Sequence, residues 1–154
     1  MANEIKDLFG SSTALTITIA SLTTGSGRQS DIVDNTSVRY GRLVLYVKVK
    51  NASSGVTANS VVEVYLIRDD NNGTNHRSDA AGASDAALTT LNSPLIGIIR
   101  NGASPNSATI YGEFVVDSPG PKWGIAIVNR TGATLDSTGS NHWARYLGIN
   151  PEVQ

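Results

Sequence analysis

Apolar and polar residues alternate with a period of two along most of this chain, and no long stripe of helical periodicity competes with that pattern. The clearest stretch is residues 38–50, where one set of positions holds Leu43, Leu45, Val47 and Val49, and the set between them holds Val44, Tyr46, Lys48 and Lys50. Successive side chains of a strand point to opposite faces, so each such stretch predicts a strand with one face in a core. The sequence therefore predicts an all-β fold.

The same alternation recurs from end to end, and turn signals rich in glycine, asparagine and proline separate its segments. Strong segments lie at residues 13–20, 38–50, 60–68, 94–100, 107–117, 122–129 and 142–149, and a weaker one at 29–36. In 94–100, the apolar run around Gly97 indicates a strand that is either buried on both faces or closed by a neighbour at the glycine. Seven or eight strands without helical crossovers favour a two-sheet antiparallel sandwich of jelly-roll type.

A length of 154 residues fits one domain. We expect a short N-terminal arm over residues 1–12, either one helical turn or extended, and a single β-sandwich domain over residues 13–154. In the arm, Ile5, Leu8 and Phe9 have no place in the strand pattern, so they either clasp a neighbouring subunit or pack under the sandwich. Residues 69–93 form a long insertion, in which 85–88 is expected to close a short helical turn.

Composition excludes several function classes. The chain has no cysteine, which rules out disulfides, thiolate nucleophiles and cysteine-based zinc sites. A net charge of -1 gives no reason to expect a nucleic-acid partner. No apolar run approaches the roughly 18 residues that cross a bilayer, so no membrane partner is expected. The first residues lack a signal-peptide core, and we expect synthesis in a host cytoplasm.

The residues that acid–base chemistry needs are few. His76 lies in a polar loop and is expected to be exposed, whereas His142 begins the last strand and is expected to hydrogen-bond a neighbouring loop. Glu63 and Glu113 sit mid-strand, so they either face one carbohydrate cleft, if their strands share a sheet, or are solvent-side residues of separate strands. The second reading is favoured, and we predict no catalytic residue, no cofactor and no enzymatic activity.

Residues 69–73, Asp-Asp-Asn-Asn-Gly, resemble the front of a calcium loop, but the bidentate glutamate that should follow is missing. A tight turn explains them, and no metal site is predicted. Arg39, Arg42, Lys48 and Lys50 form a basic stretch. Such a stretch beside an aromatic residue can contact a phosphate backbone, but it is more often a solvated face or one that meets an acidic neighbouring subunit. The expected partner-binding residues are Ile5, Leu8, Phe9, Arg39, Arg42, Lys48 and Lys50.

Several strand-and-turn motifs resemble small structural proteins of tailed bacteriophages. They are residues 122–136 (KWGIAIVNRTGATLD), 140–142 (SNH), 15–22 (LTITIASL), 27–30 (GRQS) and 33–36 (VDNT). The resemblance covers about a third of the chain and includes no reactive centre. It implies a head decoration (cement) protein of the virion surface, with a jelly-roll-like sandwich, a homotrimeric state and the major capsid protein as partner.

The residues themselves leave another function open. A carbohydrate-binding or tail- and fibre-associated module would use Tyr111, Trp123 or Trp143 as stacking platforms. An exposed aromatic side chain on a sheet face would favour that function, and burial of both tryptophans would argue against it. A small glycoside hydrolase using Glu63 and Glu113 is the least favoured alternative.

Overall fold

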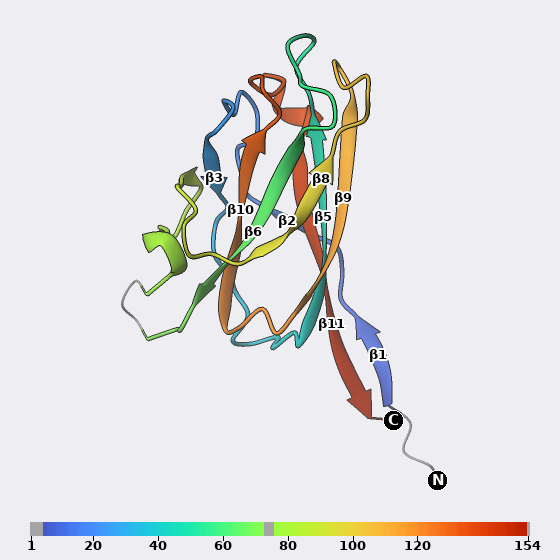
Figure 1. Ribbon diagram of the computed structural model, residues 1–154. Coiled ribbons are helices and arrows are strands. Elements are labelled where there is room, and N and C mark those ends of the chain that lie inside the picture. Colours follow the sequence, from blue (N-terminus) through green and yellow to red (C-terminus); the bar gives the residue numbers. More distant parts are fainter. Residues whose placement is uncertain (1–4, 73–75, 154) are drawn as a thin grey trace.

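The computed structural model describes residues 5–72 and 76–153, and it shows two antiparallel β-sheets packed face to face (Figure 1). This confirms the predicted two-sheet sandwich. The described helical elements are two short 3-10 turns. In chain order the elements are β1 (Ile5–Phe9), β2 (Thr13–Leu15), β3 (Gly27–Gln29), β4 (Val33–Asp34), β5 (Arg42–Lys50), β6 (Val61–Asp69), η1 (Ser78–Ala80), β7 (Ala86–Ala87), β8 (Leu95–Arg100), β9 (Thr109–Asp117), β10 (Lys122–Arg130), η2 (Gly139–Asn141) and β11 (Trp143–Val153).

Strands near the beginning of the chain pair with strands near its end, and strands nearer the middle pair with one another. The strands β1 and β2 pair with β11, β3 pairs with β10, β5 with β9, and β6 with β8. One sheet, here sheet A, has the order β1-β11-β5-β9 with β2 beside β11; the other, sheet B, has the order β7-β3-β10-β6-β8 with β4 beside β10. A long hairpin wrapped into two sheets in this way is a jelly roll.

The core lies between the sheets and is built from the alternating residues that the sequence pattern marks. From sheet A, β5 contributes four fully buried side chains, and β6 and β10 of sheet B face them; these residues are Leu43, Leu45, Val47, Val49, Val62, Val64, Trp123, Ile125 and Ile127. The ring of Trp123 meets the ring of Tyr146 edge-on, with centroids 4.9 Å apart. This contact joins the two sheets through a favourable aromatic geometry.

The central strand β10 is buried on both faces, and its sequence shows why. Its large residues point into the core, while Gly124 and Ala126 point outward under a cover of chain. A Cβ on Gly124 would lie 2.9 Å from the end of the Ile32 side chain and 3.2 Å from the Asp31 carbonyl oxygen, so the missing side chain makes room for this segment. Ala126 packs with Ile67 and Ala81 of the insertion in a second apolar cluster. The insertion thus covers part of the outer face of sheet B.

Some predicted boundaries are wrong. The strand predicted over residues 13–20 ends at Leu15. Residues 16–19 are not part of the sheet, although Ile19 remains buried. Residues 29–36 are divided between β3 and β4, and the helical turn expected at 85–88 is instead the strand β7, with η1 lying earlier. The strand β8 is an edge strand and is not buried on both faces. Phe114 packs on its Gly97, which agrees with the alternative prediction that a neighbouring residue covers the strand at the glycine. The strand β11 continues to Val153.

Candidate interaction surfaces

A two-stranded ribbon projects from one end of the sandwich (Figure 1). It consists of β1 and the end of β11, paired from Ile5 with Val153 to Phe9 with Ile149. The neighbouring strand β5 stops at Arg42, opposite Ile149, so in the described structure the last residues of β11 pair on one edge only. The predicted arm is therefore a strand over residues 5–9, while residues 1–4 lie outside the described chain.

The ribbon exposes the three apolar side chains expected to bind a partner. Ile5 is 70% exposed, Leu8 55% and Phe9 61%, so they do not pack under the sandwich. Strand alternation places Ile5 and Phe9 on one face of the ribbon and Leu8 on the other. Both faces therefore present apolar surface to solvent.

Tyr40 anchors the base of the ribbon. Its ring lies over Gly148 of β11, and its hydroxyl lies beside Gly10, whose backbone N–H donates to the Gly148 carbonyl at 2.8 Å. Asn150 of β11 binds the same segment before β5 that holds Tyr40, because its side-chain amide nitrogen donates to the Val38 carbonyl at 2.9 Å. Beside these contacts is a shallow hollow of about 270 Å³, lined by Leu8, Phe9, Gly10, Val38, Tyr40 and Asn150.

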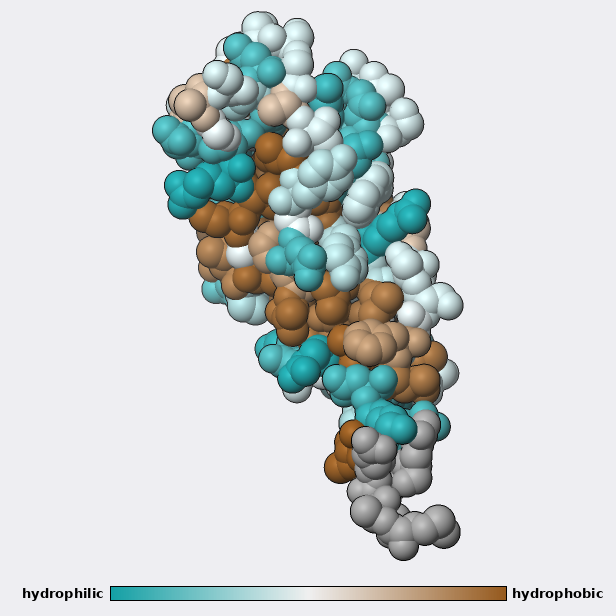
Figure 2. Space-filling view, turned by 90° about the vertical axis from the view of Figure 1, so that its right-hand side faces the viewer, coloured by the Kyte–Doolittle hydropathy of each residue, from teal (hydrophilic) through white to brown (hydrophobic). Residues whose placement is uncertain are grey.

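The outer face of sheet A forms a second surface, and the strand register arranges it in rows across β11, β5 and β9. One row holds Trp143, Lys48 and Tyr111, the next Arg145, Tyr46 and Glu113, the third Leu147, Val44 and Val115, and the last Ile149, Arg42 and Asp117. In Figure 2, hydrophobic side chains gather over the middle and lower part of the side shown, below hydrophilic loops. The last row adjoins Phe9, so the sheet face continues into the ribbon.

The predicted basic stretch is divided by the structure. Lys48 and Lys50 share the outer face of sheet A with Tyr46, as alternation predicts, and Arg42 lies on the same face in an ion pair of 2.6 Å with Asp117. Arg39 lies apart, in the turn before β5, where its Nε donates to the Thr36 carbonyl at 3.2 Å. The four residues therefore do not form one continuous basic patch.

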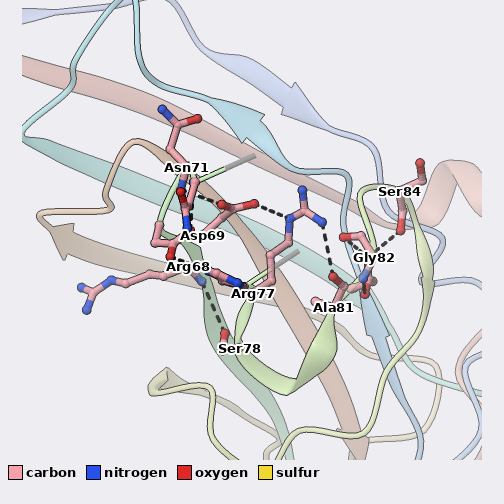
Figure 3. A network of polar contacts seen from close by, with 12 residues as sticks. Arg68, Asp69, Asn71, Arg77, Ser78, Ala81, Gly82 and Ser84 are labelled. Carbon is pink, nitrogen blue, oxygen red and sulfur yellow. Dashed lines mark hydrogen bonds and ion pairs between the residues drawn. The ribbon is translucent and has the colours of Figure 1, made fainter. Parts of the chain in front are cut away.

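The insertion is tied down by a polar network (Figure 3). The Arg77 guanidinium pairs with the nearly buried Asp69 carboxylate at 2.8 Å, and its Nη1 donates to the Ala81 carbonyl at 3.5 Å. Gln29 of β3 is buried and donates to the Gly82 and Ser84 carbonyls at 3.0 and 2.6 Å. These contacts give the buried polar groups partners and hold the insertion against sheet B.

The residues of the suspected calcium loop have other partners. Asp69 pairs with Arg77, and the Asp70 carboxylate lies 2.8 Å from the His76 ring. The backbone N–H groups of Asn71 and Asn72 donate to the side chains of Asp69 and Asp70, as in Asx turns. The tight turn predicted at residues 72–73 extends beyond the described residues. Residues 73–75 lie outside the described chain, and within the described part no three His, Asp or Glu side chains cluster as metal ligands.

The two histidines have the surroundings expected of them. His76 is exposed, whereas His142 is buried at the start of β11. Its Nδ1 accepts from the Lys50 N–H at 3.3 Å and its Nε2 lies 2.9 Å from the Asp136 carbonyl, which fixes a neutral ring with the proton on Nε2. Burial lowers the pKa of His142, because the charged ring would lose its hydration.

Glu63 and Glu113 lie on different sheets and face away from each other. Glu63 is on the outer face of sheet B, where Tyr65 Oη and Arg130 Nε both donate to its Oε2 at 3.0 Å. Glu113 is on the outer face of sheet A. The thickness of the sandwich separates them, so they cannot flank one glycosidic bond, and the hydrolase alternative is wrong in this form.

The aromatic residues fall into two groups. Trp123 is fully buried, whereas Tyr111 is 65% exposed and its ring centroid lies 6.4 Å from that of the half-buried Trp143. The Arg145 guanidinium lies 5.4 Å from the Trp143 ring centroid, a cation–π contact. The sequence named Tyr111 and Trp143 as platforms but not Arg145, although Arg145 lies two residues from Trp143 on β11 and alternation places both on one face. Only the strand order brings Tyr111 of β9 beside them.

Comparison with known proteins gives no match: no family model matches the sequence, and no curated protein matches it significantly. The described residues include no helix long and apolar enough to cross a bilayer. The fold and its surfaces are therefore the basis for a functional proposal.

Proposed function

We propose that this chain is a structural protein of a bacteriophage virion, a capsid decoration (cement) protein that self-associates as a trimer and stabilises the head by binding the major capsid protein. The observation that carries the proposal is the ribbon of β1 and β11, whose apolar side chains are exposed on both faces. An isolated two-stranded ribbon is marginally stable in water, so a neighbouring chain that covers it stabilises it.

The fold supports the same role. A jelly roll is a common architecture of viral capsid proteins, although lectins share it and fold alone does not decide function. In a sandwich, each strand is hydrogen-bonded to its neighbours within a sheet, so a shearing force must break several hydrogen bonds together. A protein bound at many equivalent lattice sites also gains affinity from multivalency, so each single contact can be modest.

Imaging tests the proposal directly. Electron microscopy of purified virions labelled with antibodies against this protein should show the label over the head. Label confined to the tail would support the fibre-associated alternative and overturn the head assignment. Absence of label from intact particles would overturn a virion role altogether.

A binding assay tests the part played by the ribbon. The protein should cosediment with assembled capsids of its phage, and deletion of residues 1–12, which removes β1, should abolish that cosedimentation. The truncated chain must keep the near-ultraviolet circular dichroism of the intact sandwich, because Trp123 and Tyr146 report the core. Unchanged cosedimentation would show that the ribbon does not contact the capsid.

A further inference from the structure

Two aromatic side chains flank a lysine in the first row of the outer face of sheet A. The register places Trp143 of β11 and Tyr111 of β9 on either side of Lys48 of β5. The two rings are inclined by 57°, and Tyr111 is the more exposed, so its ring presents a large area to solvent. We refer to Tyr111, Trp143 and Lys48 as the aromatic platform.

The row beside the platform supplies hydrogen-bonding groups of both kinds. Arg145 is a donor, Glu113 is an acceptor and Tyr46 is both. A pyranose ring has an apolar face of C–H groups, which packs on an aromatic ring, and an edge of hydroxyls, which need both donors and acceptors. An aromatic surface bordered by charged and hydroxyl groups therefore matches a sugar better than it matches a purely apolar ligand.

The charged side chains around the aromatic platform indicate which class of sugar it would bind. Around the platform three cationic side chains, Lys48, Lys50 and Arg145, accompany one carboxylate, that of Glu113. Among the described residues none of these four forms an ion pair, and the pair of Arg42 with Asp117 lies at the far end of the face. The nearby Asp136 carboxylate accepts hydrogen bonds from Thr138 and Asn141. The excess of positive charge is complementary to an anion.

We propose that the aromatic platform binds an acidic saccharide, of the uronate or sialate class. Tyr111 stacks on the sugar ring, Trp143 forms the adjoining wall, and Lys48 and Arg145 bind the carboxylate. Arg145 is already held against Trp143, so less of its conformational freedom is lost on binding. The proposal does not depend on a virion role, because its test uses the isolated protein.

Tryptophan fluorescence provides the assay. Trp123 is fully buried, so added solutes and ligands should affect the half-buried Trp143 selectively. The probes are tetragalacturonate with its neutral methyl ester, and 3′-sialyllactose with lactose. We expect at least one acidic probe to bind at least tenfold more tightly than its neutral counterpart, and we expect high salt to weaken that binding.

Matched substitutions on one strand separate the platform from the rest of the face. Tyr111→Thr should weaken binding of the acidic probe about tenfold, as loss of one stacking contact implies, and Val115→Thr should leave it unchanged. Both positions are exposed on β9, and threonine suits a strand, so each variant should fold. Lys48→Met should remove the preference for the acidic probe while keeping the side-chain stem.

Each of four outcomes would overturn the inference. These are the absence of binding by both acidic probes up to millimolar concentration, equal binding of acidic and neutral partners, equal loss in Tyr111→Thr and Val115→Thr, and tighter binding of a thymidine oligonucleotide than of any sugar. Sedimentation of the Tyr111→Thr variant completes the test. A change in oligomeric state without a change in sugar binding would assign the platform to a protein interface instead.

Discussion

Gly148 determines how closely Tyr40 approaches the ribbon. A Cβ at this position would overlap the Tyr40 ring carbons, whereas a Cβ on Gly139 would meet nothing within 4 Å. We expect Gly148→Ala to lower the free energy of unfolding by about 1–3 kcal/mol, the usual cost of overpacking, measured by denaturant titration. Gly139→Ala is the control and should be near neutral. If both variants cost the same, the Tyr40 contact is not the cause.

His142 gives a prediction at the same scale, because burial lowers its pKa. Below an ordinary histidine pKa of about 6.5, the unfolded chain takes up the proton more readily than the folded chain does. This group therefore makes stability fall as pH falls through about 6.5. Proton NMR should show one histidine titrating below that value, and His142→Gln should remove that signal. A His142 signal that titrates above 6.5 would contradict the assigned hydrogen bonds.

Among the elements, the insertion depends on Asp85. Arg28 Nε pairs with its Oδ1 at 2.6 Å, and Thr18 Oγ1 donates to its Oδ2. Burial alone would raise the pKa of Asp85, but these contacts outweigh it and the pKa is lowered. Its stabilising contribution is therefore present above the ordinary carboxyl pKa and is lost as pH falls below it.

Replacing that carboxylate should loosen the insertion. Asp85→Asn should lower the free energy of unfolding by about 1–3 kcal/mol, because it leaves Arg28 without its anion. Hydrogen exchange should also become faster at the Leu88 N–H, which donates to the Gly27 carbonyl between the insertion and β3. Asp34→Asn is the control, since within the described structure the exposed Asp34 side chain accepts hydrogen bonds from Thr36 alone, and asparagine keeps that acceptor. Unchanged exchange at Leu88 in Asp85→Asn would contradict this role.

The strands also show which elements of the fold could be predicted from the sequence. The strands β5, β6, β9 and β10 were predicted within a few residues, because each buries one or both faces and its alternation records this. The strands β3, β4 and β7 are two or three residues long, too short for periodicity to reveal. The ribbon was suspected only from three unplaced apolar residues, since the pairing of β1 with β11 joins opposite ends of the chain.

The candidate surfaces were predicted less completely than the fold for the same physical reason. Alternation placed Tyr46, Lys48 and Lys50 on one face, but it could not show which strand lies beside β5. Only the order β11-β5-β9 brings Trp143 and Tyr111 to either side of Lys48. Only the assignment of β6 and β9 to different sheets places Glu63 and Glu113 on opposite outer faces. Strand order depends on long-range pairing, which a local pattern does not encode.

In the whole molecule the two sheets differ in what covers them. Among the described residues, the insertion packs on part of the outer face of sheet B, while the outer face of sheet A and the ribbon that continues from it leave large side chains exposed, namely Tyr111, Val115, Ile5, Leu8 and Phe9. The surface available to partners is therefore concentrated on sheet A and at one end of the sandwich. Self-association through the ribbon and ligand binding at the aromatic platform would use opposite ends of this surface, so both can occur in one assembly.

Self-association is the prediction that belongs to this scale. Sedimentation should give a mass near three times 16.2 kDa. Phe9→Ser should shift that mass toward one chain, because the side chain of Phe9 is 61% exposed in the single chain and the substitution removes apolar area that the assembly would bury. Leu91→Ser is the matched control, since Leu91 is 82% exposed in the insertion, away from the ribbon. A wild-type monomer would contradict the trimer, and equal dissociation by Leu91→Ser would show that the ribbon is not its specific contact.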